Sequence, residues 1–203
     1  MKTKFIAAGL LAAMVLTIGM IPAIAQQPEE MTPEMAEMMA KWNAIKTPGE
    51  PHKKFADVVG KWTATAKFWM DPAAPPTESQ GSAEFKLILG GRYLVQEYSG
   101  DWMGETFHGM GISAFDNFRQ EYVDVWMDDM GTGIFVTHGT ADASGKVITS
   151  KGMMDDPMSG RKDVATRSVF TMVDKDTQKM EMFAIDASGK EVQAMEILYK
   201  RQK

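Results

Sequence analysis

One segment near the middle of the chain carries aromatic and acidic side chains at a spacing that could form a binding site. These residues occupy alternate positions: Tyr122, Asp124, Trp126 and Asp128. Alternate residues of a β-strand share one face, and the positions between them are apolar. If the aromatic and acidic face points into a closed sheet, Asp124, Trp126 and Asp128 line a polar pocket. If it points outward, the carboxylates only belong to a solvated surface, and the sequence leaves both interpretations open.

A glycine-rich loop follows this strand directly. Gly131 and Gly133 flank Thr132, and glycine permits a tight turn and a close approach of the backbone to a ligand. We therefore expect this loop to lie at the mouth of any pocket that Trp126 and Asp128 line.

The histidines do not follow a metal-binding pattern. His52, His108 and His138 are far apart and the chain has no cysteine, whereas a zinc site needs three or four ligands that converge. His108 and His138 fall within predicted strands, so both are candidate ligand-binding residues, with simple hydrogen-bonded histidines as the alternative. We expect no bound metal and no cofactor.

The sequence contains no recognisable catalytic motif. No serine lies in a Gly-x-Ser-x-Gly setting, and no glycine loop that could hold a phosphate precedes a helix. Asp124 with Asp128, or Glu97 with His108, could act as acid and base, but carboxylates are too common for such pairs to identify an enzyme.

The first 25 residues have the three parts of a secretory signal. Lys2 and Lys4 precede an apolar run, and the segment ends in the small residues Ala23 and Ala25. We expect cleavage after Ala25 and a periplasmic or secreted protein. The alternative is an uncleaved anchor, for which the apolar run lies near the lower limit of length. No later apolar stretch approaches that length, so we expect that the mature chain is not embedded in a membrane.

Composition limits the partners and the source of stability. The formal net charge is −5 and the basic residues form no cluster, which argues against nucleic acid as a partner. Without cysteine there can be no disulfide framework, so the exported domain must be stabilised by its core.

A short helix is predicted after a polar leader at residues 26–34. Thr32 can cap the helix and Pro33 suits its first position. Apolar residues then recur at helical spacing: Met35, Met38, Met39, Trp42 and Ile45. We expect this stripe to pack on the body of the domain.

From Gly60 onward the apolar residues alternate with a period of two, which predicts strands with one buried face. About ten runs follow this pattern: 61–70, 83–89, 91–99, 106–115, 120–128, 133–141, 146–154, 163–173, 178–186 and 191–200. Short links that contain Gly and Asp favour antiparallel neighbours. The expected fold is an all-β, antiparallel up-and-down barrel, because closure removes the exposed edges. A two-sheet sandwich is the alternative.

The segment Gly60-Lys61-Trp62 resembles the start of a calycin barrel, the group of lipocalins and fatty-acid-binding proteins. This resemblance implies that Trp62 closes one end of the barrel beneath an arginine from a late strand. Arg201 and Arg167 are the candidates for that arginine, and Gly60 and Trp62 are expected to be structural.

Several longer motifs resemble DUF1579, a bacterial family of unknown function. They include residues 89–94, 97–100, 109–111, 115–117, 126–133 and 156–160, and the similarity extends over roughly residues 50–200. It implies a calycin-like barrel and no particular activity. Arg92 and Tyr98 lie in these motifs and complete the set of candidate ligand-binding residues.

The resulting hypothesis has three parts: a signal peptide at 1–25, a leader with a short helix at 26–57, and a barrel at 58–203. The barrel is expected to bind a small apolar or amphipathic molecule. The alternatives are an enzyme that uses the same cavity, a haem-binding barrel with His108 or His138 as axial ligand, and a barrel filled by its own side chains.

Overall fold

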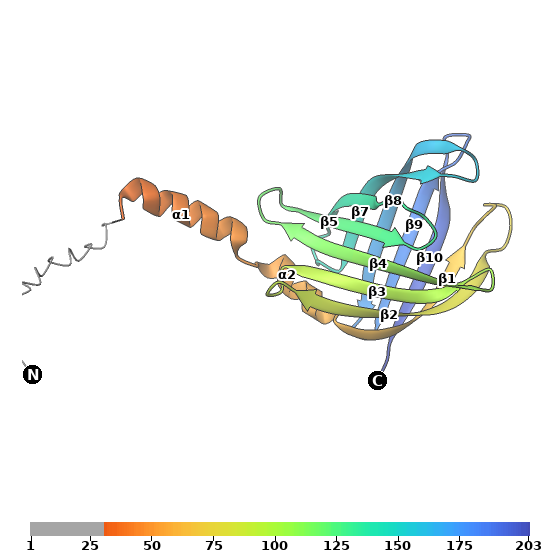
Figure 1. Cartoon of the computed structure of the whole chain (residues 1–203), viewed down its shortest axis with the longest axis horizontal. Helices are drawn as coiled ribbons and strands as arrows, with labels where there is room; N and C mark the ends of the chain where they lie inside the picture. Colours follow the sequence, from red (N-terminus) through yellow and green to blue (C-terminus); the bar gives the residue numbers. More distant parts are fainter. Residues whose placement is uncertain (1–30) are drawn as a thin grey trace, which may run out of the picture.

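A computed structural model describes residues 31–203 and shows a β-barrel preceded by short helices (Figure 1). The predicted signal peptide lies outside the described residues. The helical segments are α1 (Pro33–Lys46), α2 (Glu50–Lys54) and the 3-10 turn η1 (Phe55–Asp57). The strands are β1 (Gly60–Phe68), β2 (Thr77–Ile88), β3 (Tyr93–Trp102), β4 (Glu105–Asp116), β5 (Glu121–Asp128), β6 (Phe135–Ala141), β7 (Val147–Asp156), β8 (Arg161–Asp174), β9 (Thr177–Ile185) and β10 (Glu191–Arg201).

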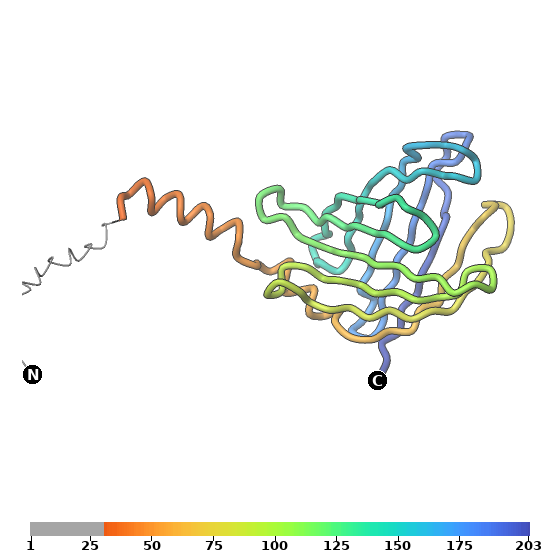
Figure 2. The backbone as a smooth tube through the Cα atoms, viewed as in Figure 1, coloured from red at the N-terminus to blue at the C-terminus, as the bar shows by residue number. Residues whose placement is uncertain are grey.

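The ten strands form one closed antiparallel sheet. Each strand pairs with its neighbours in the sequence, and β1 pairs with β10 to close the barrel. The up-and-down path of the chain can be followed in Figure 2. The predicted barrel is therefore confirmed, and the two-sheet sandwich is wrong.

One end of the barrel is covered by α2 and η1, and we call it the helix end; the opposite end, formed only by hairpin loops, is the loop end. Trp62 at the helix end is 0% exposed. Its indole Nε1 donates a hydrogen bond to the Val58 carbonyl at 2.9 Å, and the Arg201 guanidinium lies 4.1 Å above its ring. This confirms Arg201 as the arginine over the tryptophan.

Gly60 and Arg167 have different parts in this arrangement. Gly60 has a φ of 122°, which glycine adopts without strain, and it lies beside the Arg201 side chain. Arg167 stacks on Phe183 and pairs with Glu191.

The prediction that the first helix packs on the domain is wrong. No residue of α1 is buried, and the apolar stripe at residues 35–45 is between 40% and 61% exposed. Figure 1 shows α1 extending away from the barrel. The helix end already holds Phe55 and Val58 of the following segment in its core, which leaves α1 attached only near its C-terminus. No helix within residues 31–203 has the length and apolar character needed to cross a bilayer.

Candidate functional site

The inner face of the barrel can be followed from strand to strand, because directly opposed residues of an antiparallel pair lie on the same side of the sheet. Buried Trp62 pairs with Ala83, and Ala83 pairs with Tyr98. Tyr98 pairs with Gly109, which pairs with Asp128. The face of β5 that carries Tyr122, Asp124, Trp126 and Asp128 therefore points inward, and the solvated-surface interpretation does not hold.

The inner face is packed differently in its two halves. Toward the helix end, Trp62 and Gln178 are 0% exposed. Toward the loop end, the inward-facing Phe107, Trp126 and Met182 are only partly buried. Solvent therefore reaches the inner face in the loop-end half, whereas side chains fill the helix-end half.

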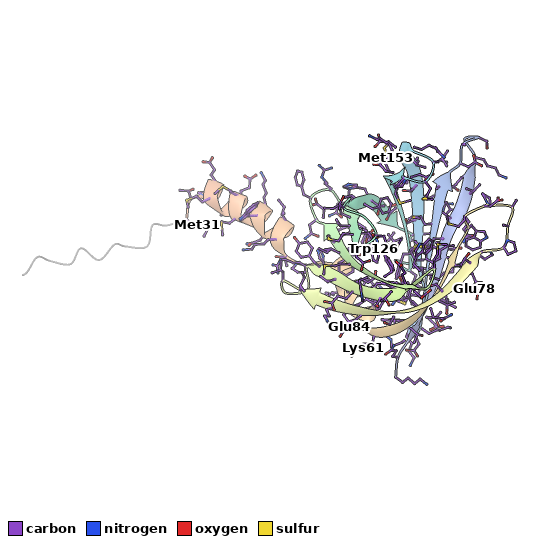
Figure 3. The ribbon with its side chains drawn as sticks, turned by 45° about the vertical axis from the view of Figure 1, so that its right-hand side comes forward. Met31, Lys61, Glu78, Glu84, Trp126 and Met153 are labelled. Atoms are coloured by element: carbon purple, nitrogen blue, oxygen red, sulfur yellow. The ribbon has the colours of Figure 1, made fainter. Side chains whose placement is uncertain are left out.

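Three aromatic rings meet in the loop-end half, and we call them the aromatic triad: Tyr98, Phe107 and Trp126. The ring centroids of Tyr98 and Phe107 are 5.7 Å apart, and those of Tyr98 and Trp126 are 6.3 Å apart. Phe107 and Trp126 complete the triad at 6.4 Å. These separations lie within the range for favourable aromatic pairs. Figure 3 shows Trp126 within the barrel, in contrast to Met153 at its outer edge.

Glycines on the neighbouring strands leave room for two rings of the triad, those of Tyr98 and Trp126. A Cβ at Gly109 would lie 2.2 Å from Cζ2 of Trp126, and a Cβ at Gly81 would lie 2.6 Å from the Tyr98 hydroxyl. Real Cβ atoms do not approach other atoms so closely. The rings of Trp126 and Tyr98 therefore occupy the space that side chains at Gly109 and Gly81 would otherwise take.

Asp128 fixes the position of the tryptophan at the loop end. Trp126 donates a hydrogen bond from Nε1 to Oδ2 of Asp128 at 2.8 Å, and the Met130 backbone N–H donates to Oδ1 at 3.1 Å. One carboxylate thus joins the ring to the start of the Gly131–Gly133 loop. Both glycines are exposed, and the loop connects β5 to β6 at the loop end, as expected of a loop at the mouth.

A polar belt crosses the inner face beside the triad, made of Ser113, Asp124 and Ser150. The Ser113 hydroxyl donates to Oδ1 of Asp124 at 2.5 Å, and the Ser150 hydroxyl donates to Oδ2 at 3.4 Å. Burial raises the pKa of Asp124, and these two hydrogen bonds oppose that increase. His138, on the outer face of the neighbouring strand, lowers the pKa of Asp124 to a smaller extent. The interior therefore contains an ionisable group whose hydrogen-bond partners are neutral hydroxyls.

Gly139 makes the connection between Asp124 and Ser150 geometrically feasible. It lies on β6, between the strands that carry the two residues, and a Cβ there would lie 2.3 Å from the Ser150 hydroxyl oxygen. Ser150 thus reaches across β6 through the space that this glycine leaves.

Other inward-facing polar groups lack protein partners. The Thr166 hydroxyl and both amide atoms of Gln178 are buried and make no hydrogen bond. Thr166 is 5% exposed and pairs with Gly152 in the sheet. Because an unpaired buried polar group costs free energy, these groups mark places where a polar partner would stabilise the barrel.

Two predicted site residues lie on the outer face, and one lies at the helix end. His108 is exposed, and His138 is exposed and forms a contact of 3.0 Å between Nδ1 and the Glu121 carboxylate. Arg92 donates to the carbonyls of Leu89 and Lys46, so it attaches the end of α1 to the barrel. The candidates that converge in the interior are Tyr98, Asp124, Trp126 and Asp128.

The histidine positions bear on the haem and metal alternatives. Neither His108 nor His138 reaches the interior, so neither can supply an axial ligand there. Within residues 31–203, no three histidine or acidic side chains converge on a point where they could hold a metal ion.

Sequence reasoning missed Phe107, Ser113, Ser150 and Thr166. The alternation in each strand could have indicated which of these residues share a face. Their convergence depends on the pairing register of five strands, which no local pattern records.

Two open pockets flank the segment that covers the helix end. One, of about 480 Å³, is lined by Met172, Asp176 and Arg201 among others. The second, of about 390 Å³, includes Lys54 and Tyr122. The packed layer around Trp62 lies between these pockets and the aromatic triad.

The comparisons with known proteins agree with this fold. A family model described as a protein of unknown function, DUF1579, matches residues 47–201. No curated protein matches the chain. Among solved structures, Rv2717c from M. tuberculosis is 15% identical, with 77% of this chain and 100% of that chain covered and a TM-score of 0.57. The S-type phycobiliprotein lyase from Guillardia theta is 13% identical, with 74% and 92% covered and a TM-score of 0.54. At such identities the likeness shows the fold alone.

Proposed function

The chain belongs to the DUF1579 family, and from its barrel we propose that it binds a small amphipathic molecule in the loop-end half of the interior. The observation that carries this proposal is the combination, on one inner face, of an aromatic triad in which Phe107 and Trp126 are partly exposed and a polar belt around Asp124.

The size of the barrel supports the proposal. An eight-stranded barrel is just wide enough for its side chains to fill, and the diameter grows with the number of strands. This barrel has ten strands, so its interior is wider than that of an eight-stranded barrel. In the loop-end half, Phe107, Trp126 and Met182 are only partly buried, which supports a ligand in that half.

The chemistry of the lining supports an amphipathic ligand. The triad offers ring faces for an apolar or planar body. Asp124 offers a carboxyl group held by two hydroxyls, and the Thr166 hydroxyl has no partner among the described residues. A pocket with a mainly apolar lining and a few convergent polar groups is the usual form of a small-molecule site.

We propose further that the protein acts outside the cytoplasm, in the periplasm or as a secreted protein. The support is the charged start, apolar run and small-residue ending of residues 1–25.

Nile red, a neutral planar dye whose fluorescence rises in apolar surroundings, tests the binding proposal. The full chain should bind the dye saturably with one site per chain, and Trp126→Ala should weaken binding by about tenfold because a stacking face is lost. His108→Ala is the matched control, since His108 is exposed on the outer face of the adjacent strand. Absence of saturable binding, or equal loss in both variants, would contradict the proposal.

A further inference from the structure

The interior holds a carboxyl group without a cation to balance it. Asp124 lies in the middle of the inner face of β5, two residues from Trp126 and paired with Ser113. Among the described residues, the other charged side chains of the inner face lie at its ends. Asp128 and Arg161 are at the loop end, where the Arg161 guanidinium donates to the Ile185 carbonyl. Arg201 is held at the helix end by Trp62 and by the carbonyls of Val59 and Asp57. In the part of the chain that the structure describes, the carboxyl of Asp124 is hydrogen-bonded to serine hydroxyls and not to a cation, although His138 on the outer face of the neighbouring strand lowers its pKa.

The surroundings of Asp124 are also favourable for a cation. Trp126, two residues from Asp124 on the same face, belongs to the aromatic triad. The faces of aromatic rings carry negative electrostatic potential and attract ammonium groups. A carboxylate and ring faces on one wall together form a site of the kind that recognises organic ammonium ions.

A second polar group lies farther round the same inner wall. The pairing Asp124–Thr137–Gly152–Thr166 runs directly across four strands, so Thr166 is about 14 Å from Asp124 along the sheet. Thr166 is 5% exposed and its hydroxyl has no partner. A hydroxyl forms hydrogen bonds as donor and acceptor, so this group is a candidate partner for a polar substituent on the body of the ligand and not for the ammonium group itself.

The distribution of charge along the barrel favours the entry of cations. The loop-end segments 69–76, 101–105, 128–134, 155–162 and 185–191 contain nine acidic and three basic residues. The helix end is reversed, with seven acidic and ten basic residues in segments 49–61, 89–92, 116–121, 141–147, 173–177 and 200–203. A mouth lined by one sign of charge raises the local concentration of ligands of opposite sign.

We propose that the ligand is a small organic cation, with its ammonium group at Asp124 and its apolar or aromatic body on the aromatic triad. This inference rests on the proposed binding function and specifies the ligand class of the same site.

Probes that share an aromatic body and carry a cationic, neutral or anionic head group test the inference. Isothermal titration of the full chain compares 2-phenylethylamine, 2-phenylethanol and phenylacetate at pH 7, together with the corresponding larger naphthyl set. A charged hydrogen bond at Asp124 should make the amine bind about ten- to a hundredfold more tightly than the alcohol, and the carboxylate should bind most weakly.

Two variants test whether the preference for the amine depends on Asp124. Asp124→Asn should reduce the preference for the amine over the alcohol to less than about threefold and leave the affinity of the alcohol nearly unchanged. Glu121→Gln removes the same charge from the same strand, but Glu121 contacts His138 on the outer face, so the preference should persist. The wild-type comparison needs no variant and stands even if Asp124→Asn fails to fold.

The outcomes distinguish failure of the cation inference from failure of the proposal that the interior binds a ligand. If the alcohol binds as tightly as the amine, or more tightly, Asp124 acts as a neutral group; the cation inference is overturned and interior binding stands. The same holds if Asp124→Asn keeps the full preference. If no probe binds and Nile red does not bind either, both proposals fall.

Discussion

Replacing Gly109 by alanine should displace Trp126 from the barrel wall. The added Cβ would lie 2.2 Å from Cζ2 and 2.6 Å from Cη2 of the indole, well inside the separation of about 3.5 Å at which carbon atoms attract one another. The ring must then move toward the interior and lose its hydrogen bond to Asp128. Overpacking of this kind costs about 1–3 kcal/mol, and the accessible interior favours the lower half of that range.

Chemical denaturation measures this cost, and Gly133→Ala is the matched control. No atom lies within 4 Å of a Cβ at Gly133, so that variant should lose less than about 0.5 kcal/mol. The same Gly109→Ala substitution in a Trp126→Leu background should cost at least about 1 kcal/mol less, because the clashing ring is absent. An equal cost in both backgrounds would refute the contact between Gly109 and Trp126.

The remaining predictions concern Trp62 at the helix end, the buried carboxyl of Asp124 and the signal peptide. Trp62→Ala should cost about 3–5 kcal/mol in chemical denaturation, as is usual for a fully buried tryptophan; a loss below about 1 kcal/mol would show that Trp62 does not close the barrel. Burial raises the folded-state pKa of Asp124 above its ordinary value of 3.8, so the barrel loses stability as pH rises through the folded pKa. Asp124→Asn should therefore gain stability over the wild type at pH 7 and lose this advantage below about pH 3.8; a difference that is independent of pH would contradict the burial of the carboxyl. Intact-mass measurement of protein from its native cell envelope should give a chain that begins at Gln26, and a chain that retains Met1 would rule out cleavage.

The strands of the barrel could be predicted because their signal is local. Alternating apolar residues such as Trp62, Ala64 and Ala66 report one buried face regardless of the partner strands. The first half of β2 lacked this signal, because residues 77–82 are polar or glycine. These residues form a strand because β1 pairs with them. Gly81 has no side chain, and the Tyr98 ring occupies the space where one would lie.

The site was only partly predictable, because it depends on which strands face each other. The alternation of β5 grouped Asp124 and Trp126, but the sequence could not decide whether their face pointed inward. Ser150 joins Asp124 across Gly139, a relation set by the register of three strands. Arg92 lies in one of the motifs that indicated the family, and it was therefore predicted to bind ligand. Its side chain instead donates to a backbone carbonyl at the end of α1. A motif therefore locates a residue that has a role without showing which role it has.

The packing of α1 was mispredicted for a related reason. A stripe such as Met35, Met38 and Trp42 shows that one helix face is apolar, but not that a surface is available to receive it. The helix end of the barrel is already filled by Phe55 and Val58, which follow α1 closely in the sequence and carry a weaker pattern.

Native mass spectrometry of the protein purified from the cells that produce it tests the central claim most directly. Wild type, Gly109→Ala and His108→Ala are compared under conditions that preserve noncovalent complexes. Binding in the loop-end interior predicts a discrete added mass of one small molecule on the wild type and on His108→Ala, and its loss from Gly109→Ala, in which the displaced indole occupies the site. A bare chain mass for the wild type, or the same added mass on all three proteins, would contradict binding at the aromatic triad.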